Sequence, residues 1–343
     1  MKNQRSSNIE LLRLLCMLGV IFLHYYNAGM GGASKYVAAG SINDIVLRSM
    51  ESFFICAVDV FVMISGYFLS QANKRTVGRA LNLLIQTSIY RILYYFVDLL
   101  LHHKSFRWLS LLYMMLPMNW FVMLYVTLYL ISPLLNHAFS LTKQKTAVLL
   151  VICLFSCFPT IADSMSALMK TNLSTFSTIS MYGNNRGYTI TNFCMCYLIG
   201  AYLRQNSFSG IRKPALVGIL LLTTCTLVLW SKKDGSTAWA YYNPVIIVHA
   251  AALILLFLKF EMGCRPVINE LSGAAFSVYI LHPWFLHMYN TEPNVNGSVF
   301  KMLLHILFTV FSIAVMSYAA DKVYKLLFGK AAQILKKYRP YTL

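Results

Sequence analysis

Three ionisable side chains share one face of an apolar segment near the start of the chain. Residues 8–26 are long and apolar enough to span a bilayer, yet they include Glu10, Arg13 and His24. In a helix, the rotation about the axis from Arg13 to His24 differs from a whole number of turns by only about 20°, so the two side chains lie on the same face. Glu10 lies one turn before Arg13 on nearly the same face. An ionisable group inside a bilayer costs several kcal/mol unless it is paired or hydrated. The stripe therefore predicts a polar path leading from one leaflet toward the other.

A further candidate, Asp59, lies in the middle of the next apolar run, A-V-D-V-F-V-M-I-S-G-Y-F-L. A lone aspartate inside a membrane indicates a functional site by default. Counting about 1.5 Å per residue from the predicted outer surface puts Asp59 and His24 at similar depths and Arg13 much deeper. We expect Asp59 to orient the His24 imidazole rather than to neutralise Arg13.

Basic side chains gather where the second apolar run ends. The short loop that follows holds Lys74, Arg75 and Arg79, and Arg91 lies farther along, inside the next run. Together with Arg13 they would place a cationic surface at the inner half of a shared cavity. Arg and Lys are the usual partners of phosphate groups, so one interpretation is a clamp for a phosphorylated ligand. The other is that the loop determines membrane topology.

Three more candidates lie toward the predicted outer side. Trp120 opens the fourth predicted span, where an aromatic ring either anchors the helix at the interface or shapes a pore mouth. Arg186 belongs to G-N-N-R-G-Y, which closes a loop rich in Ser, Thr and Asn; such groups suit a sugar ligand or a plain hydrated loop. His282 precedes Pro283 in a kinked span. It is a second catalytic histidine, a pore-lining donor or the partner of a freed backbone carbonyl.

The composition shows that these elements need a membrane. Of 343 residues, 58% are hydrophobic and only 12% are charged, which is about half the charge of a soluble domain. The formal charge of +18 sits in short loops, so it follows membrane topology and does not indicate nucleic-acid binding. The eight cysteines lie mostly in apolar runs and lack metal-ligand spacing. We interpret them as packing residues and expect no metal.

Repeated apolar runs predict an all-α polytopic protein with ten transmembrane helices around a central polar cavity. With the N-terminus inside, the inner segments hold roughly twice as many Lys and Arg as the outer ones, so both termini are predicted to be cytoplasmic. Residues 1–330 would form one membrane domain, and residues 331–343 a basic cytoplasmic tail on anionic lipid. The predicted spans are residues 9–29, 48–70, 80–101, 119–139, 146–163, 188–204, 214–231, 241–260, 271–290 and 299–321.

Several of these motifs together resemble the acyltransferase-3 family of integral membrane acyltransferases. They are E-x-x-R, ten residues and His in the first span, A-V-D-V-F-V-M-I-S-G-Y-F-L in the second, the basic cluster before the third, W-F-x-x-x-Y-x-x-L-Y-L-I-S-P-L-L-N in the fourth and S-V-Y-I-L-H-P in the ninth. The likeness covers nearly the whole chain and is strongest over residues 8–70. Arg13 and His24 match the family's arginine–ten residues–histidine pattern, and Lys74, Arg75 and Arg79 match its arginine-rich motif in part.

The resemblance implies a bacterial O-acyltransferase of the cell (inner) membrane. Its donor would be cytoplasmic acetyl-CoA or another short acyl-CoA, bound by Arg13 and the basic residues up to Arg91. Its acceptor would be a sugar hydroxyl of an extracytoplasmic, cell-surface glycan; membrane lipid and polysaccharide-assembly proteins would be further partners. His24 would be the general base or would be acylated transiently, with Asp59 holding the imidazole. The residues that bind substrate or line the pore would be Glu10, Trp120, Arg186 and His282.

Two other interpretations fit part of this pattern. In a transporter or flippase of a lipid-linked sugar or small anion, the polar stripe would be a permeation path. Such proteins show broken helices and repeat symmetry between their halves, and neither is clear in this sequence. In a purely structural interpretation, Glu10 and Arg13 form a buried ion pair and His24 packs against its neighbours. The whole constellation of intramembrane charges favours the enzyme.

Overall fold

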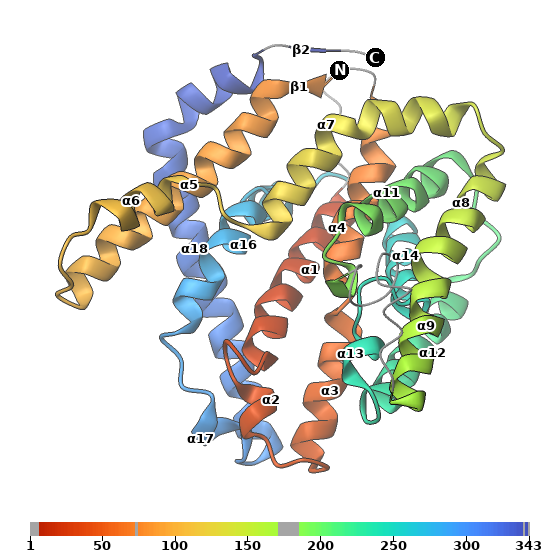
Figure 1. Ribbon diagram of the computed structural model, residues 1–343, viewed down its shortest axis with the longest axis horizontal. Helices are drawn as coiled ribbons and strands as arrows, with labels where there is room; N and C mark the ends of the chain where they lie inside the picture. The colour runs from red at the N-terminus through yellow and green to blue at the C-terminus, as the bar shows by residue number, and fades with distance from the viewer. Residues whose placement is uncertain (1–6, 73–74, 171–184, 339, 342–343) are drawn as a thin grey trace.

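The computed structural model is almost entirely helical (Figure 1). It describes residues 7–72, 75–170, 185–338 and 340–341. The short strands β1 (Arg75–Thr76) and β2 (Pro340–Tyr341) pair antiparallel. The helices are α1 Ser7–Tyr26, α2 Ala33–Tyr36, α3 Ile42–Phe54, α4 Ala57–Leu69, α5 Val77–Leu101, α6 Trp108–Met115, α7 Trp120–Ser140, α8 Gln144–Ile152, α9 Phe158–Met169, α11 Ile190–Gln205, α12 Lys213–Ser231, α13 Gly235–Ala238, α14 Pro244–Leu258, α15 Pro266–Ser272, α16 Ala275–Leu286, α17 Glu292–Val295 and α18 Val299–Lys336.

The helices confirm the prediction of an all-α polytopic membrane protein. Among the described residues, 7 segments are long and apolar enough to cross a membrane: Ser7–Tyr26, Ile42–Leu69, Val77–Leu101, Trp108–Ser140, Gln144–Met169, Lys213–Ser231 and Val299–Leu335. α14 and α16 are apolar but shorter, and α11 has 16 residues. The 7 segments coincide with predicted spans, because a bilayer requires about 20 apolar residues and hydropathy detects such a run. The remaining predicted spans, residues 188–204, 241–260 and 271–290, fall on the shorter helices α11, α14 and α16.

α1 is the helix around which the others pack. It contacts α3, α4, α14, α15, α16 and α18, and it lies in the middle of the bundle (Figure 1). Its side chains are buried on several sides: Leu12, Met17, Ile21 and Tyr25 are each at most 2% exposed. Between membrane helices such burial stabilises through close packing more than through exclusion of water. Side chains on α1 are thereby held in fixed positions relative to their neighbours.

Two glycines allow α4 and α11 to approach closely. A Cβ atom at Gly66 would lie 2.0 Å from the Tyr197 carbonyl oxygen, and one at Gly200 would lie 2.0 Å from the Met63 carbonyl oxygen. Small residues support helix association in membranes by allowing this kind of backbone contact. The pairing brings Asp59 on α4 against α11.

Both ends of the chain lie at one face of the bundle, which we call the terminal face (Figure 1). β1 pairs with β2 at this face, and the Ser7 amide donates to the Gly263 carbonyl oxygen at 3.0 Å. α2, α13 and α17 lie toward the opposite face. Ends on a shared face agree with an even number of crossings. α18 is continuous to Lys336, so the predicted tail at residues 331–343 begins inside a helix.

Candidate active site

His24 on α1 and His282 on α16 are in direct contact. His282 Nε2 lies 3.0 Å from His24 Nδ1, and the ring centroids are 4.5 Å apart. His24 Nδ1 also lies 2.9 Å from the Val20 carbonyl oxygen, and His282 Nδ1 lies 3.0 Å from the Val278 carbonyl oxygen. Each carbonyl belongs to the preceding turn of the same helix, so each backbone holds its own imidazole in place. The sequence identified both histidines as candidates but did not pair them.

The acceptors around the two rings determine where the protons sit. A carbonyl oxygen only accepts, so His282 Nδ1 carries a hydrogen and donates it to Val278. In the neutral ring, His282 Nε2 is then an acceptor that faces the Nδ1–H of His24. This leaves the lone pair of His24 on Nε2, for which no hydrogen bond to a described residue is recorded. His24 is partly exposed whereas His282 is buried, so His24 Nε2 is the nitrogen able to take a proton.

Asp59 does not orient His24 in this structure, contrary to our expectation. It is fully buried, and its Oδ1 accepts hydrogen bonds from Asn192 Nδ2 at 3.1 Å and from Cys196 Sγ at 3.4 Å. These contacts tie α4 to α11. Depth in the membrane fixes the height of a residue but not the helix that it faces, which is why the prediction failed. His282 occupies the position expected for Asp59.

Glu10 and Arg13 form an ion pair near the start of α1. Arg13 Nη1 donates to Glu10 Oε1 at 2.7 Å, and Glu10 Oε2 accepts from Ser272 on α15. The Glu10 side chain is only 7% exposed, whereas that of Arg13 is 28% exposed. A guanidinium has five N–H donors, so the bond to Glu10 leaves others free for an anionic ligand.

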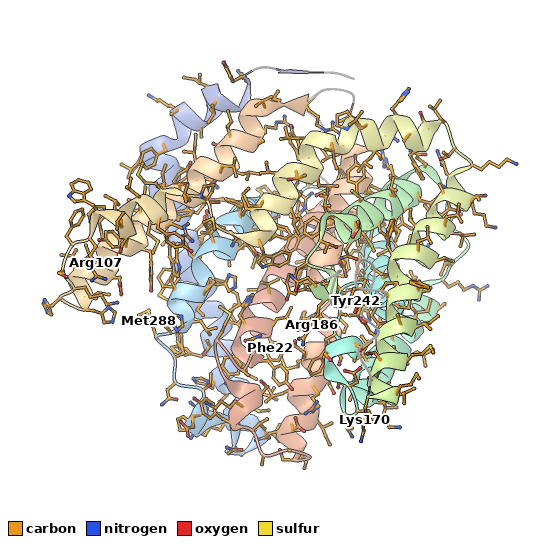
Figure 2. The ribbon with its side chains drawn as sticks, in the orientation of Figure 1. Phe22, Arg107, Lys170, Arg186, Tyr242 and Met288 are labelled. Carbon is orange, nitrogen blue, oxygen red and sulfur yellow. The ribbon has the colours of Figure 1, made fainter. Side chains whose placement is uncertain are left out.

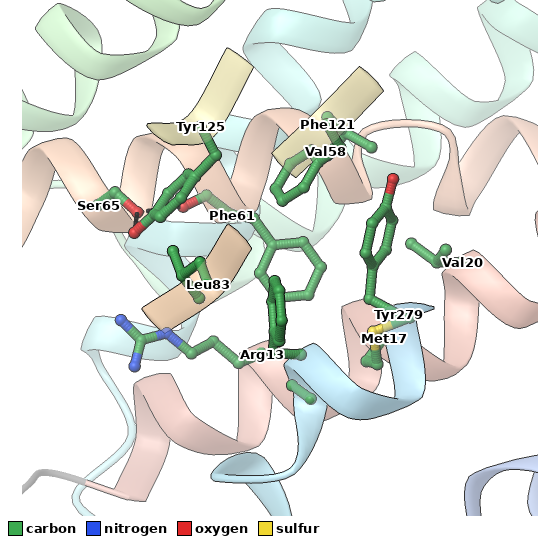
Figure 3. A pocket seen from close by; sticks show the side chains of 12 residues that line it. Arg13, Met17, Val20, Val58, Phe61, Ser65, Leu83, Phe121, Tyr125 and Tyr279 are labelled. Carbon is green, nitrogen blue, oxygen red and sulfur yellow. Dashed lines mark hydrogen bonds between the residues drawn. The ribbon is translucent and has the colours of Figure 1, made fainter. Parts of the chain in front are cut away.

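A cavity of about 300 Å³, which we call the central cavity, lies beside Arg13 (Figure 3). Its apolar wall is formed by Met17, Val20, Val58, Phe61, Leu83, Phe121, Ala275 and Phe276. Its polar groups come from Arg13, Ser65, Tyr125 and Tyr279. The sequence predicted a central polar cavity; a cavity is present here, but its wall is mainly apolar and carries few polar groups.

The central cavity leads from Arg13 toward the histidine pair. Figure 3 shows the Arg13 guanidinium at the end near Ser65, and Tyr279 with Val20 at the other end. The Val20 carbonyl oxygen is the one that holds His24. The Tyr279 ring lies 5.9 Å from the His282 ring. A ligand extended along this cavity would thus reach from a cation to the edge of the pair.

A larger cavity of about 710 Å³, the terminal cavity, lies between the first turns of α5 and the C-terminal part of α18, which Figure 1 shows near the terminal face. It shares Leu83, Tyr125 and Phe276 with the central cavity, so the two adjoin. Arg79 and Lys325 line it, and both are exposed. Among the described residues of the predicted basic loop, Arg79 is thus the one that remains available to an anion in this cavity.

Arg75 is not available to a phosphate group, which corrects its predicted role. It is 1% exposed and donates to Ser132 Oγ at 2.9 Å, to the Ala72 carbonyl oxygen at 2.7 Å and to the Leu69 carbonyl oxygen at 2.8 Å. The guanidinium therefore joins the end of α4 to α7. The density of basic residues in a loop does not reveal which of them fold back onto backbone carbonyls.

Arg91 also lies elsewhere than expected. Its Nη1 donates to the Met118 carbonyl oxygen at 3.1 Å, and its guanidinium carbon lies 5.2 Å from the Tyr113 ring centroid. It therefore holds the link between α6 and α7 and lines neither the central nor the terminal cavity. Lys74, the remaining predicted phosphate-binding residue, lies outside the described residues.

Trp120 and Arg186 belong to the part of the molecule nearer the opposite face. The Trp120 ring lies 4.4 Å from that of Tyr188. The Arg186 carbonyl oxygen accepts from the Tyr241 amide at 3.0 Å, and Figure 2 shows Arg186 beside Tyr242. Arg186 lines a cavity of about 410 Å³, which we call the opposite cavity. Trp120 does not line this cavity, but its ring contacts Tyr188, which does.

The opposite cavity contains a residue that the sequence interpretation missed. Glu51 lines it, is 8% exposed and belongs to α3. The signal was present, because Glu51 is an acid inside the predicted span 48–70, about two turns before Asp59. Tyr125 and Tyr279 of the central cavity were missed for another reason: single tyrosines in apolar spans carry no spacing that distinguishes a cavity from packing.

A family model described as an acyltransferase domain matches residues 6–321. This range contains the histidine pair, the Glu10–Arg13 pair and Arg79. No curated protein and no solved structure matched the chain. The match over nearly the whole chain agrees with the motifs in the first, second and ninth spans.

Proposed function

Because this chain belongs to the acyltransferase-3 family and is a membrane acyltransferase, we propose that its donor is a cytoplasmic acyl-CoA and its acceptor an extracytoplasmic glycan. The group transferred would be acetyl or another short acyl group, and the acceptor atom a sugar hydroxyl. The small central cavity supports a short acyl group, because about 300 Å³ with a mainly apolar wall leaves little room for a long chain.

The donor would enter from the terminal face. Exposed Arg79 in the terminal cavity and partly exposed Arg13 in the adjoining central cavity would pair with the phosphate groups and the polar arm of CoA. The thioester would then reach the end of the central cavity near Tyr279. On this proposed route the terminal face would be cytoplasmic, in line with the prediction from the distribution of Lys and Arg.

The chemical step would take place at His24. His24 Nε2 would accept the proton of the sugar hydroxyl as its oxygen attacks the thioester carbonyl carbon. The carbon–sulfur bond would break, and the proton would pass from the imidazolium to the departing thiolate. The products are the sugar ester and CoA. General base catalysis of this kind contributes typically about 10²–10⁴-fold.

The observation that supports this proposal most directly is the 3.0 Å contact between His24 Nδ1 and His282 Nε2. Together with the Val20 carbonyl oxygen, which faces the same Nδ1, it leaves the free lone pair on His24 Nε2. It also gives the imidazolium an acceptor when the ring is charged. An oriented base is what general base catalysis requires, and a packing histidine has no need of one.

A transfer assay tests the proposal. The purified protein in lipid nanodiscs is incubated with acetyl-labelled acetyl-CoA and polysaccharide from cells that lack this protein. We expect label in the polysaccharide, in an ester that mild base releases. If wild-type protein moves no label while it moves unlabelled glycan across a vesicle membrane, the transporter alternative is correct. Membrane lipid and polysaccharide-assembly proteins, which we propose as partners, could then be added to the same assay.

A further inference from the structure

We propose that the opposite cavity binds the sugar of the acceptor, with Glu51 as the hydrogen-bonding group that selects it and Trp239 as the aromatic wall against which it packs. This inference rests on the proposed acyltransferase function and adds to it the place and the chemistry of acceptor binding. The cavity has a volume of about 410 Å³ and lies beyond the end of α1.

Glu51 provides the first observation. Its side chain lines the cavity, yet the residue is only 8% exposed, and its Oε2 has no hydrogen-bond partner among the described residues. A buried carboxyl oxygen without a partner costs about 1–3 kcal/mol or more. A ligand that brings a hydroxyl hydrogen to this oxygen would remove that cost. The Glu51 Oε2 atom can therefore accept a hydrogen bond from a ligand, because no described residue of the chain donates one to it.

Trp239 provides the second observation. Its Nε1 donates to Ser52 Oγ at 3.2 Å, and its ring meets that of Tyr26 at 5.8 Å and 86°. Arg48 lies 6.0 Å from the same ring. The indole is therefore held from several sides while it lines the cavity. A rigid aromatic ring offers an apolar surface at low entropic cost, as ligand sites require.

The charges around the cavity indicate a neutral ligand. Glu51 and Arg186 line the same space, together with the hydroxyls of Ser34 and Ser236. An acid and a guanidinium in one small cavity disfavour a ligand with strong charge of either sign. A neutral polyhydroxyl compound can both donate to Glu51 and accept from Arg186. A sugar residue has that chemistry together with an apolar face for Trp239.

The cavity is close to the proposed base. Asn27 lines it and lies three residues after His24, which corresponds to about 5 Å along a helix axis. A series of ring contacts leads from the cavity toward the histidine pair. The Tyr188 ring, which lines the cavity, lies 4.4 Å from the Trp120 ring, and Trp120 contacts Phe121. The Phe121 ring in turn lies 4.9 Å from the Tyr279 ring. A sugar held here would approach the histidine pair from the face opposite to the donor route.

Equilibrium binding tests the inference without relying on catalysis. Full-length protein in nanodiscs is titrated with radiolabelled maltose, N-acetylglucosamine and, as a charged probe, galacturonic acid. We expect a neutral sugar to bind, and Glu51→Ala to weaken its binding about tenfold, the loss of one hydrogen bond. Glu51→Gln should retain part of the affinity. Trp239→Leu should weaken binding as well, whereas Trp108→Leu, at a residue on α6 that is 70% exposed, should not.

Kinetics separate this inference from the proposed function. Glu51→Ala should raise the acceptor KM about tenfold and leave the KM for acetyl-CoA unchanged. Failure of wild-type protein to transfer label would overturn the enzymatic proposal alone, because binding still reports on the cavity. The sugar site is overturned if no probe binds, if Glu51→Ala and Trp239→Leu bind sugar as wild type does, or if galacturonic acid binds best. Comparable thermal unfolding of the variants would show that they fold.

Discussion

His282 Nε2 lies 3.0 Å from His24 Nδ1, and the hydrogen bond of His282 Nδ1 to the Val278 carbonyl oxygen makes that Nε2 an acceptor. Two helices that are distant in the sequence, α1 and α16, thus contribute one histidine each, and their contact leaves the lone pair of His24 on Nε2. The arrangement has the logic of a general base oriented by a second group, with a neutral imidazole where other enzymes use a carboxylate.

Replacing His24 by Ala should remove the base and leave the donor site intact. We expect kcat for transfer to fall by about 10²–10⁴, with the KM for acetyl-CoA little changed because Arg13 and Arg79 remain. Transfer of labelled acetyl groups measures the change. His137→Ala, at an exposed histidine on α7, is the matched control and should keep wild-type activity. Full activity of the His24 variant would exclude His24 as base and as acylated nucleophile.

His282 should act by positioning His24. His282→Ala removes one of the two acceptors of the His24 Nδ1–H and leaves the Val20 carbonyl oxygen. We therefore expect kcat to fall by no more than about tenfold, which corresponds to about 1.4 kcal/mol, the upper end for one hydrogen bond. Substrate KM values should not change. His282→Gln offers an amide oxygen and should recover part of the loss. A purely structural role predicts no such recovery, and a loss as large as that of His24→Ala would indicate direct contact with substrate.

Asp59→Asn distinguishes the two candidates for the orienting group. Asn can still accept from Asn192, and Asp59 makes no recorded contact with His24, so we expect kcat close to wild type. The substitution is expected to weaken the contact between α4 and α11, which would lower the thermal unfolding temperature. A fall in kcat similar to that of His282→Ala, at unchanged stability, would restore Asp59 as the group that orients the imidazole.

The sequence predicts those parts of the site whose partners share one helix. Glu10 and Arg13 lie one turn apart, and their ion pair follows from that spacing. The partner of His24 is on another helix, and its identity depends on how α1 and α16 are rotated against each other. Hydropathy determines which segments cross a bilayer, but it does not determine their neighbours. Depth alone therefore led to Asp59 as the partner of His24, and His282 was not paired with it.

Local composition has the same limit for charged residues. The loop after α4 was predicted to be cationic, and it is, but Arg75 folds back onto Ser132 while Arg79 stays exposed. Whether a guanidinium meets a protein acceptor or a ligand depends on the turn that carries it. Span boundaries were affected in a similar way: the predicted span 48–70 is divided into α3 and α4 at Ile55–Cys56.

Arg79 and Arg75 should therefore respond differently to the same substitution. Arg79→Ala should raise the KM for acetyl-CoA about tenfold, the loss of one charge-assisted hydrogen bond, without changing thermal stability. Arg75→Ala removes the guanidinium donor from the Ala72 carbonyl oxygen and the Ser132 hydroxyl, and one of several donors from the Leu69 carbonyl oxygen, which keeps its bonds from Asn136 Nδ2 and the Ala72 amide. It should lower the free energy of unfolding by about 2–4 kcal/mol. Equal effects of the two variants on the donor KM, with both proteins stable, would contradict this assignment.

The close contact of α4 and α11 predicts that Gly200→Ala destabilises the protein. The added Cβ would lie 2.0 Å from the Met63 carbonyl oxygen, an atom of the backbone that cannot rotate away. The helices must separate, and overpacking of this kind costs about 1–3 kcal/mol. Gly218→Ala on α12 is the matched control, because, apart from the adjoining residues and backbone of its own helix, no atom of a described residue lies within 4 Å of the position that its methyl group would take. It should be neutral or stabilise by up to about 1 kcal/mol through helix propensity.

Thermal unfolding of both variants in nanodiscs tests whether the contact is as close as the structure shows. Separation of α4 from α11 would also disturb the bonds of Asp59 to Asn192 and Cys196, which lie on the same seam. The histidine pair is on α1 and α16, so Gly200→Ala should lose stability while the kcat of the protein that remains folded stays near that of wild type. Equal unfolding temperatures for Gly200→Ala and Gly218→Ala would mean that the two helices can separate without cost.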